Sequence, residues 1–138
     1  MGRPKPPGII SNMQLVDNEI KYWKFILNLR NHPTVKQGFV EQREITEEEH
    51  YNFMRQYGDC YFICLAQGTP AGFVGSIKGD IRVATHPDFQ GHGVGKYMIN
   101  ELMKRYPDSF AKVKIHNRAS EKLFESCGFK KKYYIMER

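Results

Sequence analysis

Apolar residues recur at helical spacing in the first third of the chain. From residue 18 onward, Ile20, Trp23, Ile26 and Leu27 fall on one face of a helix. The Asn-His-Pro stretch 31–33 is expected to end this helix, because proline disfavours helical geometry in the residue before it. The pattern also predicts a short strand over 12–16 and a second helical piece between residues 35 and 40.

A further helix is expected to begin at Thr46. Thr46 and Glu49 have the spacing of a capping box, in which each side chain bonds the backbone N–H of the other residue. The apolar residues Tyr51, Phe53 and Met54 follow, and we expect the helix to stop at 58–59.

The pattern changes from helical to extended after residue 59. The stretches 60–66, 71–77 and 80–85 are mostly apolar, and the short turns 67–70 and 78–79 separate them. We therefore predict an antiparallel meander of three strands in the middle of the chain.

The last third alternates between the two patterns. We expect a helix that runs to residue 106, a strand over 109–115, a helix over 119–126 and a final strand over 129–136. The whole order predicts a mixed α/β (α+β) fold around one central sheet. We expect a single domain over 12–138 and a flexible N-terminal tail over 1–11.

Composition narrows the class of protein. The chain has 138 residues, of which 41% are apolar and 26% charged, and this is typical of one globular domain. No apolar run is long enough to cross a membrane, and the first residues lack the apolar core of a signal peptide. The three cysteines have no histidine at zinc-like spacing, so we expect neither disulfides nor a metal site. A cytoplasmic protein without membrane partners is expected.

The net charge of +6 indicates an anionic ligand or partner. The densest basic run, 130–132, precedes Tyr133 and Tyr134, which could stack on nucleic-acid bases. The same segment is also typical of an edge strand, where lysines discourage aggregation. We favour the edge strand and do not expect a nucleic-acid partner.

A glycine-rich turn lies between the strand over 80–85 and the helix after it. Gly91, Gly93 and Gly95 allow a ligand to approach the backbone closely, and the helix N-terminus attracts anions. Gln90 and Tyr97 stand where a nucleoside-triphosphate loop needs Gly and Ser or Thr, and a lysine at 96 replaces the third glycine of a dinucleotide fingerprint. The turn therefore predicts a phosphate cradle of another kind.

Two motifs resemble those of the GNAT superfamily of acyl-CoA N-acetyltransferases. The first is Gln-x-x-Gly-x-Gly over 90–95, and the second is the stretch 117–129, with Asn117, an aromatic residue and the closing Gly-Phe pair. The resemblance covers roughly 60–136, and the earlier part matches only in helical character. It implies a central, mostly antiparallel, splayed sheet flanked by helices.

The resemblance also implies acetyl-CoA as cosubstrate, without a metal. In the family, the strand before the turn holds the pantetheine arm, and the turn holds the pyrophosphate. Asn117 would reach the pantetheine and could also cap the following helix. The cofactor-binding residues implied in this way are Val83, Ala84, Thr85, Gln90, Gly91, His92, Gly93, Val94, Gly95, Lys96, Asn117 and Phe124.

Asp80 matches the place where several family members keep a glutamate base. It is one methylene shorter and would act through water, although a turn-capping role is an equal alternative. His86 and His116 are further candidates at the same end of the sheet. Many relatives carry a tyrosine seven residues after the asparagine and use it as the acid, but here that position is Phe124. The replacement leaves open a module that binds acetyl-CoA without turnover.

The segment 23–54 resembles the entry helices of bacterial acetyltransferases that act on amino sugars, including nucleotide-activated ones. Arg30 and Glu44 would then recognise the acceptor, or they could form solvated surface. A protein amine, as in ribosomal-protein acetyltransferases, is the alternative acceptor. A monomer or a homodimer is expected.

Overall fold

The computed structural model describes residues 12–138, so the predicted tail over 1–11 lies outside it. The first half of the chain contains β1 (Met13–Asp17), α1 (Ile20–Asn31), α2 (Pro33–Lys36) and α3 (Glu47–Tyr57). A short 3₁₀ turn, η1 (Gly58–Cys60), leads into β2 (Tyr61–Ala66), β3 (Thr69–Ile77) and β4 (Asp80–Thr85). A second 3₁₀ turn, η2 (Pro87–Phe89), precedes α4 (Val94–Arg105) and α5 (Arg118–Ser126). The predicted α/β class is confirmed.

The strands form a four-stranded antiparallel sheet in the order β1-β2-β3-β4. The hairpins β2–β3 and β3–β4 have two-residue turns, Gln67-Gly68 and Lys78-Gly79, and all four residues have positive φ. A type I′ turn requires positive φ at both central residues, and its twist suits a hairpin. The predicted meander is thereby confirmed.

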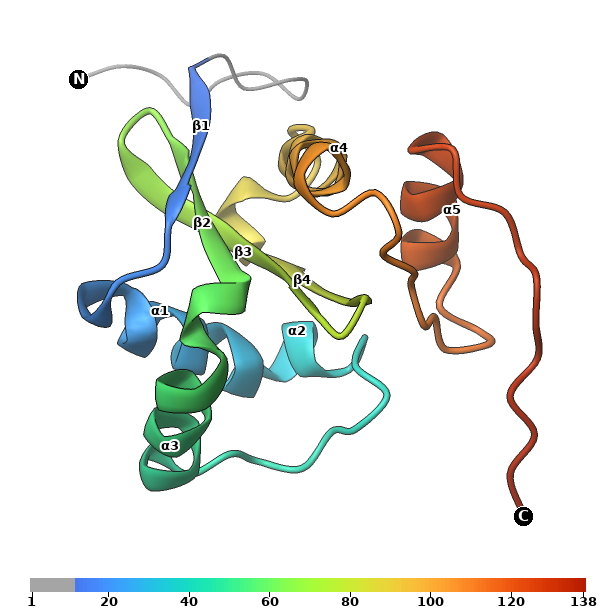
Figure 1. The fold of residues 1–138 in the computed structure, drawn as a ribbon, viewed down its shortest axis with the longest axis horizontal. Coiled ribbons are helices and arrows are strands. Elements are labelled where there is room, and N and C mark those ends of the chain that lie inside the picture. The colour runs from blue at the N-terminus through green and yellow to red at the C-terminus, as the bar shows by residue number, and fades with distance from the viewer. Residues whose placement is uncertain (1–11) are drawn as a thin grey trace.

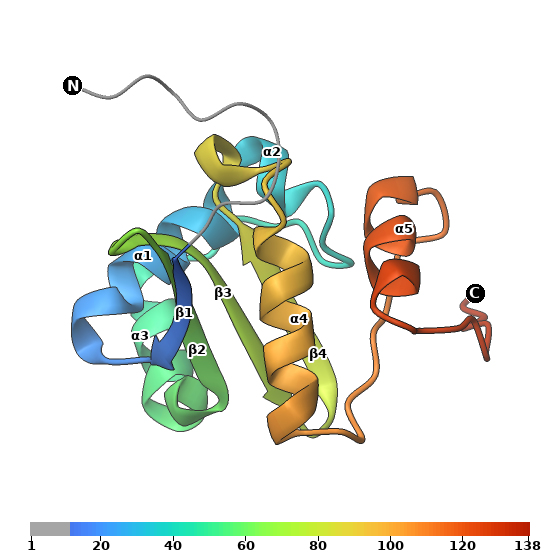
Figure 2. The same ribbon diagram turned by 90° about the horizontal axis from the view of Figure 1, so that it is seen from above.

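Helices cover both faces of the sheet (Figures 1 and 2). Alternate residues of β2 point to opposite faces, so Ile63 packs with α1 and α3, whereas Cys64 packs with α4. Met98 and Leu102 of α4 have no exposed surface. α5 packs on α4. Among residues 12–138, no helix combines the length and apolar character needed to cross a membrane.

The capping box predicted at Thr46 is formed. The hydroxyl of Thr46 accepts a hydrogen bond from the N–H of Glu49 over 3.1 Å, and the Glu49 carboxylate accepts from the Thr46 N–H over 3.1 Å. The second helical piece lies earlier than predicted, because Pro33 supplies the first helical residue of α2.

The strand predicted over 109–115 is wrong. Among residues 12–138, the one residue of this segment that bridges β4 is Phe110, which pairs with Asp80 through backbone hydrogen bonds to Gly79 and Ile81 on either side of it. After Phe110 the chain leaves the sheet, and the Lys114 ammonium donates to the carbonyl of Gln37 over 3.1 Å. Ile115 is 78% exposed. A strand forms only where a neighbouring strand pairs with it along its length. This segment has a single bridge to β4, so its extended propensity alone does not make it a strand.

The final strand predicted over 129–136 is also wrong. Tyr133, Tyr134, Ile135 and Met136 are between 69% and 90% exposed. Lys131 instead forms an ion pair with Glu121 of α5 over 2.8 Å. Since the segment 111–115 has left the sheet, it offers this stretch no paired strand to extend.

Candidate functional site

The glycine turn lies between η2 and α4. Gly91 and Gly93 have φ values of +80° and +84°, a conformation that strains any residue with a Cβ. Gly93 is the N-cap of α4, and the buried Val94 anchors the first turn. The Gln90 side chain donates to the carbonyl of Thr85 over 3.5 Å and so links the turn to the end of β4.

The backbone of this turn suits an anion. The first N–H groups of a helix have no partner within the helix, and the helix dipole adds partial positive charge there. His92, Lys96 and the three glycines therefore surround a helix start that can hold phosphate oxygens.

One edge of β4 is open. On one side β4 pairs with β3 along its whole length, and on the other side the one described residue that bridges it is Phe110. From Arg82 to Thr85, the edge that faces the segment 111–115 therefore has no strand partner among the described residues. An extended ligand can add to such an edge through main-chain hydrogen bonds.

α5 closes one side of the turn. A Cβ built at Gly95 would lie 3.1 Å from the side chain of Leu123 and 3.6 Å from the hydroxyl of Thr85, so a larger residue here would have to push the Leu123 side chain back. Asn117 caps α5, because its side-chain oxygen accepts from the N–H of Ser120 over 3.1 Å. Phe124 is 7% exposed.

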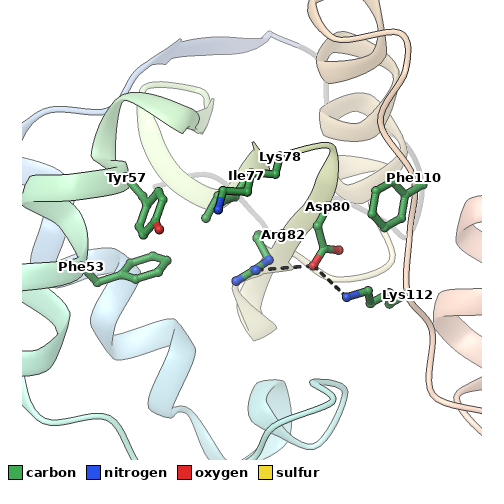
Figure 3. Close-up of a pocket in the computed structure, with 8 residues that line it drawn as sticks. All are labelled: Phe53, Tyr57, Ile77, Lys78, Asp80, Arg82, Phe110 and Lys112. Carbon is green, nitrogen blue, oxygen red and sulfur yellow. Dashed lines mark hydrogen bonds and ion pairs between the residues drawn. The ribbon is translucent and has the colours of Figure 1, made fainter. Parts of the chain in front are cut away.

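A pocket of about 380 Å³ lies at the opposite end of β4 (Figure 3). Asp80 and Arg82 are two residues apart on β4 and therefore share one face of the strand. The strand length puts Asp80 about 16 Å from Thr85, the end of β4 from which the chain continues to the glycine turn. His86 directly follows Thr85, so it lies at the other end of β4 from Asp80 and not, as predicted, at the same end. The lining residues are Phe53, Tyr57, Ile77, Lys78, Asp80, Arg82, Phe110 and Lys112.

Asp80 lies between two cations. Its carboxylate is 3.4 Å from the guanidinium of Arg82 and 3.6 Å from the ammonium of Lys112 (Figure 3). The Asp80 side chain is 18% exposed, whereas those of Arg82 and Lys112 are 40% and 47% exposed. Asp80 is thus the inner group, and the two cations reach toward solvent.

Arg30 and Glu44, the two predicted acceptor residues, have different surroundings. The Arg30 guanidinium stacks over the ring of Phe53, 4.7 Å from its centroid, and so lies next to a pocket residue. Glu44 is exposed in the loop before α3.

Sequence reasoning did not single out Arg82, Lys112, Phe53, Tyr57 or Phe110. For Arg82 a signal was present, because it follows Asp80 at strand spacing. The other four reach the pocket only through the packing of distant segments. Within residues 12–138, no group of three metal-ligating side chains could hold a metal ion.

A family model described as acetyltransferase (GNAT) family matches residues 23–129. Comparison of the sequence with curated proteins gives no significant match.

Similar solved structures agree with the fold. Spermidine N-acetyltransferase from Vibrio cholerae, solved with CoA and spermine, has a TM-score of 0.79 at 20% identity, covering 93% of this chain and 86% of that one. An N-acetyltransferase from Staphylococcus aureus Mu50 has a TM-score of 0.70 at 18% identity, covering 87% and 84%. The enzyme AAC(6')-Iy, solved with a CoA bisubstrate analogue, has a TM-score of 0.68 at 18% identity, covering 93% and 98%.

These structures share the fold, and the family model spans most of the chain. The chain belongs to the GNAT family of acetyltransferases.

Proposed function

We propose that this protein transfers an acetyl group from acetyl-CoA to a primary amine. One observation carries the proposal: the open edge of β4 connects the glycine turn at one end to the pocket around Asp80 at the other. A long cosubstrate with phosphates at one end and a thioester at the other fits this arrangement. Structures with CoA or a CoA analogue bound share the fold and support the choice.

The residues suit each part of the cosubstrate. Val83, Ala84 and Thr85 would hold the pantetheine arm along the open edge, in the manner of an added strand. The N–H groups of residues 91–96 would hold the pyrophosphate, and the exposed Lys96 would add a point charge. Gln90 would keep the turn in place through its bond to Thr85.

Acetyl-CoA supplies an activated thioester, so direct transfer needs no enzyme nucleophile. The amine nitrogen attacks the thioester carbonyl to form the amide bond, the C–S bond breaks, and CoA leaves as the thiolate. The nitrogen must also lose a proton, and the Asp80 carboxylate is the group we propose to receive it, through a water molecule. Arg82 and Lys112 hold this carboxylate in position. Phe124 has no proton to donate, and its burial keeps it within the apolar cluster beside α4.

For the acceptor we propose an amino sugar, and a protein amine is the alternative. Neighbouring structures carry spermine or an aminoglycoside-derived analogue, which are small-molecule amines. Arg30, next to the pocket wall, is the better placed of the two residues proposed to recognise the acceptor.

Thermal unfolding with and without acetyl-CoA tests the cosubstrate. A ligand of the native state at about 100 times its dissociation constant adds roughly 2.7 kcal/mol, so a clear rise in midpoint is expected. CoA release is then measured with a panel of amines. An unchanged midpoint at saturating acetyl-CoA would refute the proposal, and a raised midpoint without CoA release for any amine would favour a non-catalytic binding module.

A further inference from the structure

The pocket around Asp80 has an excess of positive charge. Three of its lining side chains, Lys78, Arg82 and Lys112, are cationic, and Asp80 is the single carboxylate among the eight lining residues. Asp80 can compensate one of the three charges. The pocket therefore presents a surplus of positive charge to whatever binds in it.

A fourth cation lies behind the pocket wall. Burial lowers the pKa of Arg30; Tyr61 opposes this shift, and the positive charge of Arg82 adds to it. The positive charges of Arg30 and Arg82 both oppose the rise in the pKa of Tyr61 that burial causes. Cations that disfavour each other's charged form in this way favour a bound anion that compensates them.

The walls of the pocket are aromatic. Phe53 and Tyr57 of α3 lie on one side of Asp80 and Arg82, and Phe110 lies on the other side (Figure 3). Aromatic walls suit an apolar body, while a few polar groups fix its orientation. The polar groups here are one carboxylate and the cations beside it.

We propose that the acceptor is an amine that also carries a carboxylate or phosphate a few bonds from its nitrogen; this rests on the acetyl transfer proposed above. The ammonium of the acceptor approaches Asp80, and its acid group binds Arg82 and Lys112. Both cations lie within 3.6 Å of the Asp80 carboxylate, so the two charges of the acceptor must be close together. A polyamine, which carries only positive charges, is repelled.

Isothermal titration calorimetry of the full chain tests this inference with pairs of amines that have or lack an acid group. Phenylalanine is compared with 2-phenylethylamine, and O-phosphoethanolamine with ethanolamine, each with and without CoA. The members of each pair differ in the acid group, and the first pair also offers a ring to the aromatic walls. In each pair we expect the member with the acid group to bind at least tenfold more tightly. A larger ratio of affinities in the first pair would indicate a carboxylate on the acceptor, and a larger ratio in the second pair would indicate a phosphate. Spermidine is expected to bind no more tightly than 2-phenylethylamine or ethanolamine, the two amines that lack an acid group.

Variants locate the effect in the pocket. Arg82→Met and, separately, Lys112→Met are expected to remove most of the preference within each pair. Lys122→Met removes an exposed lysine on α5 that does not line the pocket, and it should keep the preference. Lys112→Met serves if Arg82→Met fails to fold, because Lys112 is half-exposed and outside the sheet.

Equal affinities within both pairs would overturn the proposal, as would a preference that survives both pocket variants. No measurable binding by any of the four amines would overturn it too. The titrations without CoA do not depend on acetyl transfer. Failure of the proposed function shows separately, as an unchanged unfolding midpoint with acetyl-CoA.

Discussion

The guanidinium of Arg30 lies 3.0 Å from Nδ1 of His50, whose side chain has no exposed surface. Arginine has only donors, so Nδ1 must accept this bond, and the proton of the neutral ring sits on Nε2. Nε2 then donates to the carbonyl of Trp23 over 2.7 Å. These bonds tie α3 to α1 through a neutral histidine.

His50 should make the protein less stable in acid. Burial, together with the Arg30 charge, lowers the pKa of His50 to about 4, although its bond to Trp23 opposes the shift. Below pH 6.5 the unfolded chain binds a proton at this residue, but the native protein does not until about pH 4. The free energy of unfolding should therefore fall by about 3 kcal/mol as pH drops across this window, since each pKa unit corresponds to about 1.4 kcal/mol.

Urea unfolding of the wild type and His50→Gln at several pH values measures this contribution. Glutamine keeps an N–H for the Trp23 carbonyl but does not titrate, so the variant should lose less stability between pH 6.5 and 4. Other groups titrate in both proteins and cancel in the difference. Parallel curves for the two proteins would contradict a neutral, buried His50.

The elements that sequence predicted well are those whose signal is local. The capping box at Thr46 and the turn at 78–79 each specify their own backbone. The strands over 109–115 and 129–136 were predicted from extended propensity alone, but a strand exists only with a partner. Whether a partner lies alongside depends on packing between distant segments, which local pattern does not contain.

The difference between local signals and long-range packing also holds for the candidate site. The glycine turn could be recognised because its chemistry lies in consecutive residues, from Gln90 to Lys96. The pocket could be only half predicted. Asp80 was identified, but Phe53 and Lys112 come from segments about 30 residues away on either side, and no spacing rule relates them to Asp80.

Gly93→Ala should remove the stabilisation by acetyl-CoA. Alanine is strained at a φ of +84°, so the turn must change its shape and redirect the N–H groups at the start of α4. Gly68→Ala is a matched control, because Gly68 has a φ of +80° in the β2–β3 hairpin and nothing lies within 4 Å of an added Cβ. Both variants should lose about 1–2 kcal/mol of stability.

Thermal unfolding with and without acetyl-CoA separates the two glycine variants. The control should keep the rise in midpoint, and Gly93→Ala should lose it. If both variants respond to acetyl-CoA like the wild type, the turn does not hold the pyrophosphate.

The exposed stretch 130–136 should contribute little to stability. Tyr134 is 87% exposed, so Tyr134→Ser is expected to change the free energy of unfolding by less than about 0.5 kcal/mol. Phe124→Ala leaves a cavity where a buried ring packs beside α4, so it should lower the free energy of unfolding by about 3 kcal/mol or more. Chemical denaturation compares them. A cost for Tyr134→Ser close to that of Phe124→Ala would mean that the stretch is packed in solution.

Asp80→Asn tests the base directly. The substitution keeps the size of the side chain but removes its charge and its ability to take a proton, so kcat should fall by about 100-fold with the best amine of the CoA-release panel. The affinity for acetyl-CoA should stay within about twofold, because the residues proposed to hold its phosphates come after the far end of β4, and that end, Thr85, lies about 16 Å from Asp80. Asp59→Asn, which removes an exposed carboxylate outside the pocket, is the control and should leave kcat unchanged. Full turnover of Asp80→Asn at every pH would show that Asp80 is not the base, and its role would then be to hold Arg82 and Lys112 in place.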